Sequence, residues 1–334
     1  MDSVKKHWPD ADRTVFIVDS IKNKINPKKE NFKIIEACTL NIPRFKHMAF
    51  AFTPSEFCFV LKPFCAAHLL KSDNCKAVAY FDADMMFFQR PVEIEEMIKK
   101  HSVILSPHRL DPGLKRTVGF EHLQDGLFNA GFFAASKCDE SFDMLEWWSN
   151  QLREPSNIRA EWRWDQGWLN LVPLYFPKSG ILKKHNYNVA FWNVSERKIH
   201  QDKYGDWKCD EDKLTLFHFS LFDLQIPEKL TGARDYCPLG FNELLLPLIR
   251  EYAQRMFAAG WVDAHSLPYD YSFFSDGKKI SKSHRMFFRQ RMFSVITEKQ
   301  DPFDPKMEPL GLKSLYNYDH PIPRLVRFLK GTCQ

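Results

Sequence analysis

The chain has 334 residues, of which 44% are hydrophobic and 27% charged, a composition that excludes a disordered chain and is typical of a globular protein. Its net charge of +5 is mild and its basic residues are spread out, so charge alone does not point to nucleic acid as a partner. Because no apolar run approaches the ~20 residues of a membrane-spanning helix and the first residues lack a signal-peptide pattern, we expect a cytoplasmic protein with reduced cysteines.

Four short apolar runs predict strands that are buried on both faces. Segments with helical spacing of apolar residues separate these runs, which cover residues 14–18, 32–35, 77–81 and 102–105. Strands that alternate with helices favour an α/β fold. We therefore expect a mostly parallel sheet with helices on both of its faces.

Two helices and a change of composition complete the expected organisation. Pro91 begins one helix, with acidic residues first and lysines last, as the helix dipole favours. A second helix follows Ser141, and its apolar stripe is expected to face the core. Toward the C-terminus the chain has helical spacing and then a basic, Phe-rich stretch. We therefore expect an α/β domain at 1–240 and a helical, basic region at 241–334.

The clearest chemical motif is the block 80–88, YFDADMMFF, in which Asp82 and Asp84 lie among apolar residues. An unpaired buried carboxylate is so unfavourable that these acids need a partner, usually a cation. Residues two apart on a strand end point the same way, which suits a divalent ion that also binds diphosphate oxygens. The alternative is that one acid caps a turn while the other pairs with an arginine.

The second motif is the strand-like run 126–133, GLFNAGFF, which Asn129 and Gly131 interrupt. A glycine in such a run indicates a bulge or the close approach of a ligand to the backbone. The amide of Asn129 could bind hydroxyl groups, and the alternative is an ordinary turn asparagine.

The third motif, WRWDQGWLN at 162–170, places Asp165 and Gln166 among three tryptophans. Aromatic faces beside an acid and an amide suit a sugar site. The alternative is the N-terminus of a helix, with Asp165 as its cap and the tryptophans in the core.

The fourth motif, LFHFSLF at 216–222, carries His218 on an apolar run. A lone histidine there is more often a core residue than a ligand. If the two aspartates hold a metal, however, a neutral imidazole is a natural third ligand.

The four motifs, in this order, resemble those of the retaining glycosyltransferases of the glycogenin and lipopolysaccharide-galactosyltransferase type, glycosyltransferase family 8. They also resemble related bacterial nucleotide-diphospho-sugar transferases with the Rossmann-like GT-A fold. The resemblance covers residues 1 to about 230 and implies a site for Mn²⁺ or Mg²⁺ made by Asp82, Asp84 and His218. The implied donor contacts are Lys62, Asp82, Asp125, Asn129 and Gly131, and the implied catalytic residues are Asp165 and Gln166.

The activity that the resemblance implies is transfer of a hexose, with retention, from a nucleotide-diphosphate sugar to a saccharide or lipid-linked acceptor in bacterial surface polysaccharide synthesis. A front-face mechanism would use Gln166 or Asp165 only for positioning, whereas a double displacement would need Asp165 or Asp125 below the sugar ring. Three other classes stay open: a phosphohydrolase, a nucleotidyltransferase and a catalytically inactive sugar-binding module.

Two features depart from the family pattern. Leu221 stands where the family's His motif has a glycine whose backbone approaches the diphosphate. The segment 3–19 looks like the end of the family's first helix and its second strand. We therefore expect the first strand, which normally contacts the nucleotide base, to be missing here and to be found upstream in the parent reading frame. The alternative is that another segment fills its position in the sheet.

The segment 278–291, KKISKSHRMFFRQR, holds six lysines or arginines interleaved with apolar residues. One hypothesis is an amphipathic helix that makes peripheral contact with the inner face of the membrane. The alternatives are a solvated basic face whose Phe residues pack inward and a basic groove for an acidic acceptor glycan.

Overall fold

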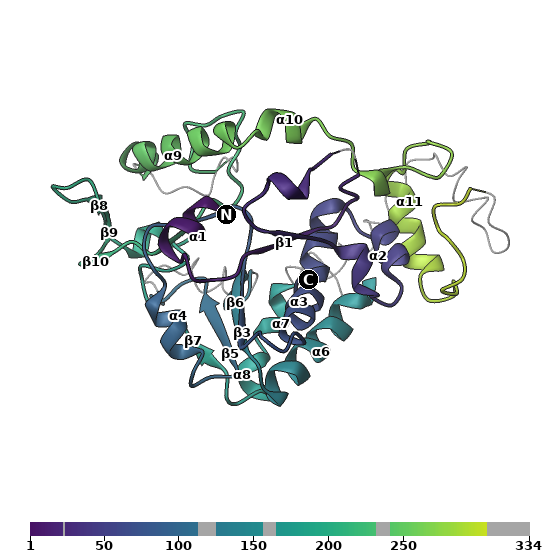
Figure 1. The fold of residues 1–334 in the computed structure, drawn as a ribbon, viewed down its shortest axis with the longest axis horizontal. Coiled ribbons are helices and arrows are strands. Elements are labelled where there is room, and N and C mark those ends of the chain that lie inside the picture. The colour runs from purple at the N-terminus through teal and green to yellow at the C-terminus, as the bar shows by residue number, and fades with distance from the viewer. Residues whose placement is uncertain (23, 113–124, 156–164, 232–240, 306–334) are drawn as a thin grey trace, which may run out of the picture.

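The computed structural model describes residues 1–22, 24–112, 125–155, 165–231 and 241–305, and Figure 1 shows their arrangement. The strands are β1 Thr14–Ile17, β2 Lys33–Glu36, β3 Ala77–Phe81, β4 Met85–Phe87, β5 Val103–Pro107, β6 Phe128–Ser136, β7 Gly180–Ile181, β8 Ile199–Gln201, β9 Trp207–Cys209, β10 Asp212–Lys213 and β11 Leu216–His218. The α-helices are α1 Asp2–His7, α2 Phe45–Ala51, α3 Pro54–Leu70, α4 Val92–Met97, α6 Asp139–Arg153, α7 Gln166–Leu169, α8 Val172–Tyr175, α9 Phe241–Ala258, α10 Trp261–His265 and α11 Lys282–Phe287. The four predicted strands and the two predicted helices are all present.

The central sheet has its strands in the order β3-β6-β5-β7. β6 is antiparallel to β3 and to β5, whereas β5 and β7 are parallel. β3, β5 and β7 therefore run in one direction and β6 runs against them, which confirms an α/β fold with a mostly parallel sheet. Because β6 is antiparallel to β3, its first residues lie beside the last residues of β3, and the Asp82 amide donates to the Gly131 carbonyl at 2.8 Å.

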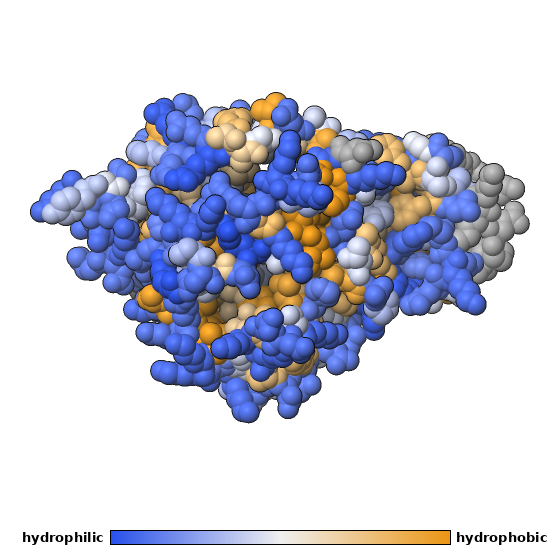
Figure 2. All heavy atoms as spheres, in the orientation of Figure 1, coloured by the Kyte–Doolittle hydropathy of each residue, from blue (hydrophilic) through white to orange (hydrophobic). Residues whose placement is uncertain are grey.

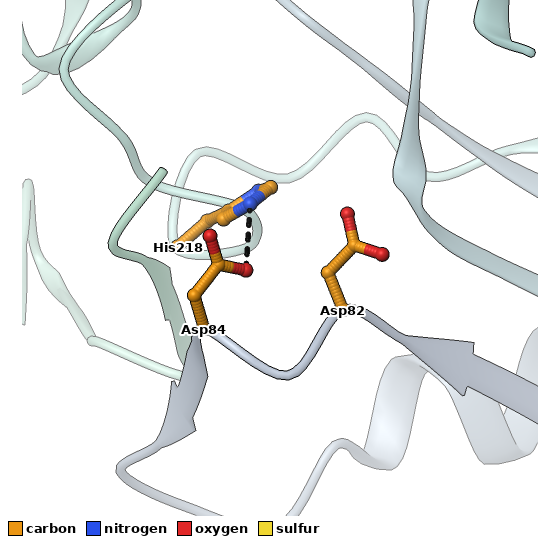
Figure 3. Close-up of side chains that lie close together, drawn as sticks. All are labelled: Asp82, Asp84 and His218. Carbon is orange, nitrogen blue, oxygen red and sulfur yellow. Dashed lines mark ion pairs between the residues drawn. The ribbon is translucent and has the colours of Figure 1, made fainter. Parts of the chain in front are cut away.

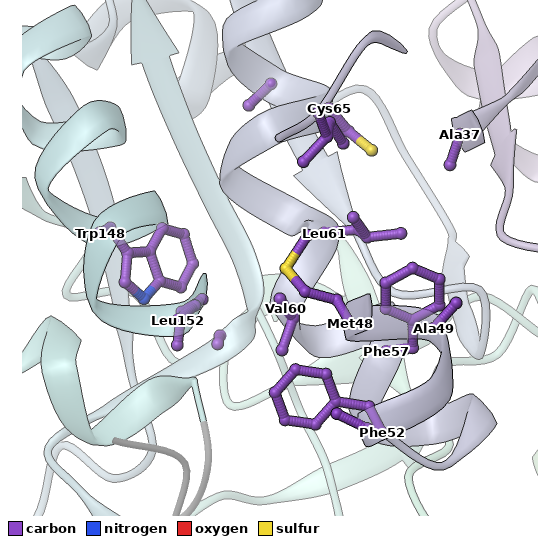
Figure 4. Close-up of a cluster of buried hydrophobic side chains, with 14 of the residues drawn as sticks. Ala37, Met48, Ala49, Phe52, Phe57, Val60, Leu61, Cys65, Trp148 and Leu152 are labelled. Carbon is purple, nitrogen blue, oxygen red and sulfur yellow. The ribbon is translucent and has the colours of Figure 1, made fainter. Parts of the chain in front are cut away.

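Successive side chains of the central strands pack on opposite faces of the sheet, as the strand period requires. Phe133 of β6 belongs to the core that α3 and α6 cover, and its ring lies 5.2 Å from that of Trp148 on α6. Its neighbour Phe132 belongs to a second cluster that includes Ile94 of α4. Helices therefore cover both faces, as predicted. Figure 4 shows the α6 side chains Trp148 and Leu152 in the first of these clusters, beside residues of α2 and α3.

Helix α3 places Lys62 beneath the end of the sheet. The helix begins at a capping box, in which Thr53 Oγ1 accepts from the Glu56 amide and Glu56 Oε2 accepts from the Thr53 amide at 2.8 Å. Pro54 occupies the first helical position, where its missing N–H costs no hydrogen bond. The helix packs against α6 and β3. Lys62 is thereby brought close to the end of β3, where Asp82 follows.

A second, smaller pairing carries His218. β11 is antiparallel to β4, and His218 lies opposite Met85. Behind this pair lies a separate core that includes Phe217 and Phe219, against which Leu245 and Leu248 of α9 pack. The antiparallel strands β8, β9 and β10 form a hairpin sheet at one end of the molecule (Figure 1). The turn between β3 and β4 is therefore held between two cores, with His218 beside it.

The two N-terminal strands, β1 and β2, pair with each other in parallel and form a two-stranded sheet of their own among the described residues. Phe16 and Val18 of this region pack against the core that α3 covers. The expectation of a further strand upstream stays a prediction.

The segment 278–291 does not present its cations on one surface. Arg285 is buried, and its guanidinium donates to the carbonyls of Ala49, Phe50 and Phe52 at the end of α2. Arg289 donates to the Ala51 carbonyl and pairs with Glu56. The amphipathic interpretation is therefore wrong for these two arginines, because the last carbonyls of a helix need donors and a buried guanidinium supplies them. Phe288 is fully buried, as the alternative with inward Phe residues predicts.

Figure 2 shows a mostly hydrophilic face with apolar residues visible in a band across its middle. Among the described residues, none of the helices combines the length and the apolar character needed to cross a membrane.

Candidate functional site

Three side chains predicted as metal ligands meet at the ends of β3 and β11. Asp82 and Asp84 lie in the turn that joins β3 to β4, and His218 ends β11 (Figure 3). Their ligand atoms all lie within 4.8 Å of one another. His218 Nε2 is 3.2 Å from Asp84 Oδ1, and both carboxylates point to the same side of the turn (Figure 3). This group of two carboxylates and one imidazole could hold a metal ion.

The donor set suits a divalent cation that prefers oxygen ligands, with one imidazole as a third ligand. Burial alone would raise the pKa of Asp84, but the adjacent His218 and the nearby Lys62 outweigh it and hold this pKa below its usual value. The carboxylate is thus in the anionic form that a cation requires.

Lys62 lies beside the cluster, with its side chain only 2% exposed. Its Nζ is 3.2 Å from Asp82 Oδ1 and 2.9 Å from Asp165 Oδ2, and it donates to the Ala130 carbonyl at 3.0 Å. Burial by itself would lower the pKa of Lys62, yet the two carboxylates raise it, so the ammonium stays charged. The resemblance implied a donor contact, and the structure surrounds this ammonium with oxygens of the protein itself.

Asp82 has a second partner in Tyr80. The Tyr80 hydroxyl donates to Asp82 Oδ1 at 2.7 Å, the oxygen that also faces Lys62. Burial raises the pKa of Tyr80 well above its usual value, so this hydroxyl keeps its proton and remains a donor. The Asp82 carboxylate is therefore oriented by the protein from one side.

Gly131 is required by the side chain of His218. A Cβ at residue 131 would lie 2.6 Å from His218 Cε1 and 2.9 Å from Met85 Cε, which is closer than real contacts allow. Close approach to the backbone was predicted at this glycine, and the group that approaches in the structure is the imidazole. Asn129 Oδ1 accepts from the Gly131 amide at 3.1 Å and so shapes the same turn.

Asp165 and Gln166 lie at the start of α7, next to the same cluster. Asp165 occupies the N-cap position but makes no capping hydrogen bond with its side chain, which pairs with Lys62 instead. Gln166 Nε2 donates to the Asp125 carbonyl at 2.8 Å, and Gln166 Oε1 accepts from Asn129 Nδ2 at 3.4 Å. The structure thus brings together all of the residues predicted for donor binding and catalysis.

Of the three tryptophans of the third motif, Trp168 lies among the described residues. Trp162 and Trp164 lie outside the described residues. Trp168 packs against the main core, with its ring 6.2 Å from that of Trp147, as the alternative of a core tryptophan predicts.

Two polar residues that the motifs did not identify complete the site. Asn188 Oδ1 lies 3.1 Å from His218 Nδ1, and His108 Nε2 lies 3.3 Å from Asn129 Nδ2. Both side chains are buried. The only local signal for Asn188 is a polar residue between Tyr187 and Val189 in a segment without a clear period.

Leu221 follows the His218 strand and has a φ of 58°, in the left-handed region that favours glycine. Its side chain is 59% exposed. The chain therefore adopts at Leu221 a conformation that a glycine would reach without strain, although the residue is a leucine.

No family model matches the chain. It is similar to two uncharacterized proteins of Bacillus subtilis (strain 168): YfnD, 28% identical over 232 residues that span 64% of this chain and 72% of YfnD, and YfnF, 30% identical over 174 residues that span 50% and 56%.

Two solved structures are also similar. One is the galactosyltransferase LgtC in complex with donor and acceptor sugar analogs, with 14% identity, 76% of this chain and 89% of that chain covered, and a TM-score of 0.43. The other is mouse xyloside xylosyltransferase 1 in its apo form, with 15% identity, coverage of 56% and 74%, and a TM-score of 0.34.

Proposed function

We propose that this chain is a metal-dependent glycosyltransferase that moves a hexose from a nucleotide-diphosphate sugar to a saccharide or lipid-linked acceptor. The observation that carries the proposal is the meeting of Asp82, Asp84 and His218 within 4.8 Å at the ends of two strands. Amide and carboxylate side chains suited to sugar hydroxyls adjoin this group. An acceptor of this kind would place the enzyme in the synthesis of bacterial surface polysaccharide.

In this proposal, Asp82, Asp84 and His218 hold Mn²⁺ or Mg²⁺. When bound, the cation neutralises the charge that develops on the departing diphosphate. Lys62 bridges the carboxylates of Asp82 and Asp165 and so fixes both, since its Nζ lies 3.2 Å from one and 2.9 Å from the other. Asn129 and Gly131 would contact the donor sugar, and Asp125 fixes Gln166 through its carbonyl.

We further propose that Gln166 and Asp165 position the sugar in a reaction that retains the anomeric configuration. Asp165 is buried and paired with Lys62, which favours a positioning role over attack on the sugar. The α/β domain at 1–240 would supply these groups. Helix α9 of the region 241–334 would support His218, because it packs behind β11.

Turnover of a panel of nucleotide-diphosphate hexoses tests the proposal. We expect release of the nucleoside diphosphate with Mn²⁺ and none with a chelator, and a loss of at least about 100-fold in Asp84→Asn. Asp206→Asn is the matched control, since Asp206 pairs with Lys213 on the exposed hairpin far from the cluster. Proton NMR of the first sugar product reports whether its configuration is retained.

The other functional classes give different outcomes in the same assay. Release of inorganic phosphate would indicate a phosphohydrolase, and pyrophosphate exchange would indicate a nucleotidyltransferase. Binding of a donor without turnover would leave a sugar-binding module. Equal turnover with Mn²⁺ and with the chelator would contradict the metal-dependent mechanism.

A further inference from the structure

Asn188 lies directly beside the candidate metal cluster although it belongs to a segment between β7 and β8. The segment is bound to β11 through its neighbour, because the Val189 amide donates to Leu216 at 3.1 Å and the His218 amide donates to Val189 at 2.7 Å. Asn188 is fully buried and has a φ of 48°. Asparagine tolerates this left-handed conformation better than most residues, which points to a side chain that is needed at this position.

The orientation of each amide in this region follows from one unambiguous donor. The Gly131 backbone N–H can only donate, so the atom of Asn129 that lies 3.1 Å from it is the carbonyl oxygen Oδ1. Asn188 approaches the same oxygen at 3.3 Å, and therefore must present its NH₂ group there. The same NH₂ group is 3.3 Å from Ser106 Oγ. The oxygen of Asn188 is thereby directed to the opposite side.

That oxygen lies 3.1 Å from His218 Nδ1. An amide oxygen carries no hydrogen, so Nδ1 must carry the proton of the imidazole. In the neutral ring the lone pair is then on Nε2, which faces Asp84 Oδ1 at 3.2 Å. A lone pair and a carboxylate oxygen at this distance repel each other unless a positive charge, either a proton on Nε2 or a metal ion, lies between them. Because Nδ1 keeps its proton for Asn188, Nε2 is the nitrogen that is available to a metal ion.

The series of hydrogen-bonded side-chain amides continues from Asn188 away from the histidine. Asn129 uses its own NH₂ group toward Gln166 Oε1 at 3.4 Å and toward His108 Nε2 at 3.3 Å. Gln166 in turn donates to the Asp125 carbonyl at 2.8 Å. Each group in the series from His218 to Asp125 donates to the next, so a reversed amide would set two donors or two acceptors against each other.

We infer that Asn188 is a positioning residue that fixes His218 in the tautomer able to bind a cation and links this ligand to Gln166 through Asn129. The link to catalysis rests on the proposed function, whereas the tautomer does not. The partner of a metal-bound histidine commonly fixes the ring in this way, and its loss weakens metal binding by about 10- to 100-fold.

The test uses two replacements that suit the left-handed backbone. Asn188→Asp keeps the oxygen acceptor toward His218 and loses the NH₂ group that faces Asn129, so it separates the tautomer from the link to Gln166. Asn188→Gly removes the whole side chain without backbone strain. Asn41→Gly is the matched control, because Asn41 has a similar φ of 53° and is exposed in another part of the chain. All four proteins, including the wild type, are labelled with ¹⁵N-histidine, and the His218 signals are identified by their absence in His218→Gln.

Without metal, we expect long-range ¹H–¹⁵N spectra to show His218 protonated at Nδ1 in the wild type, in Asn188→Asp and in Asn41→Gly. Asn188→Gly should show a mixture of tautomers. Electron paramagnetic resonance of free Mn²⁺ gives the dissociation constant for Mn²⁺. This constant should rise about 10- to 100-fold in Asn188→Gly, whereas Asn188→Asp should bind Mn²⁺ no more weakly than the wild type.

Three results would overturn the inference. A neutral wild-type His218 with its single proton on Nε2 is decisive without any variant, even if Asn188→Gly does not fold. A folded Asn188→Gly that keeps both the Nδ1 tautomer and the wild-type Mn²⁺ affinity would also refute it, as would an Asn188→Asp that behaves like the glycine variant. Failure of the proposed transferase activity would leave the tautomer measurement unchanged, so the two failures are distinguishable.

Discussion

Lys62 shows how charge is balanced at the scale of single residues in this site. Its ammonium is buried between Asp82 and Asp165. An uncompensated buried charge is strongly destabilising, whereas a cation with two carboxylates and a carbonyl around it can be retained. The two carboxylates leave one negative charge in excess around Lys62, and the carboxylate of Asp84 adds another on the side of His218. The site is therefore charged to attract a divalent cation.

Leu221 offers a test of local strain. A left-handed conformation costs a residue with a Cβ roughly 1–2 kcal/mol, and the exposed leucine side chain recovers little of this. Glycine removes the strain but adds freedom to the unfolded chain, at roughly 0.5–1 kcal/mol. We expect Leu221→Gly to leave the free energy of unfolding unchanged or to raise it by up to about 1.5 kcal/mol, as measured by urea denaturation.

Ile226→Gly is the control for this measurement. Ile226 is another partly exposed aliphatic residue in the same loop, and its φ is not positive. There the glycine removes no strain, so the free energy of unfolding should fall by about 1 kcal/mol. Equal losses in both variants would show that the backbone at Leu221 is not strained.

Side chains with a local pattern could be predicted, and those defined only by tertiary contacts could not. Asp82 and Asp84 are conspicuous as acids in an apolar block, and His218 gains meaning once they are paired with it. Asn188 and His218 are 30 positions apart, and no spacing rule connects an asparagine in an irregular segment to a strand that distant. The role of Gly131 was predicted as close approach, but the group that approaches could be named only from the structure.

At the scale of elements, the short helix α2 depends on a distant arginine. Arg285 donates to the carbonyls of Ala49, Phe50 and Phe52 and also to that of Tyr271. The carbonyls of Ala49, Phe50 and Phe52 lie at the C-terminal end of α2, where backbone donors are lacking. Removing a buried charged donor leaves several acceptors without partners, each at about 1–3 kcal/mol.

We therefore expect Arg285→Met, which keeps an apolar stem but loses the guanidinium, to lower the free energy of unfolding by at least about 4 kcal/mol. Arg291→Met is the matched control, because Arg291 is an exposed cation of the same stretch, and its loss should change stability by less than about 0.5 kcal/mol. Both values come from urea denaturation. Equal effects of the two replacements would contradict the capping role.

The elements themselves were largely predictable because each strand is a compact apolar run. β3 and β5 are such runs, and the acidic start of α4 marks a helix N-terminus. The segment 278–291 shows where prediction from helical periodicity fails. Helical periodicity assigns every cation to a solvated face, but Arg285 finds its partners 236 positions away, at carbonyls that no sequence pattern can mark.

At the scale of the whole molecule, the fold acts by bringing two cores together at one turn. The core under α3 and α6 supports β3, Lys62 and Asp165, whereas the core under α9 supports β11 and His218. Alternation of strands and helices predicted the α/β class and the helices on both faces. The reversed strand β6 places Asn129 and Gly131 beside Asp82, a consequence of strand order that the sequence does not reveal.

The central claim is a site in which a nucleotide-diphosphate sugar is held through a metal ion, and the melting temperature measures it most directly. A ligand that binds only the folded chain raises this temperature by mass action. For the wild type, we expect a nucleotide-diphosphate hexose at about 100 times its dissociation constant to raise it by about 5 °C with Mn²⁺ and not with a chelator. The shift should vanish in Asp84→Asn. A donor that stabilises the protein equally with the chelator, or a panel of donors that gives no shift with Mn²⁺, would contradict the account.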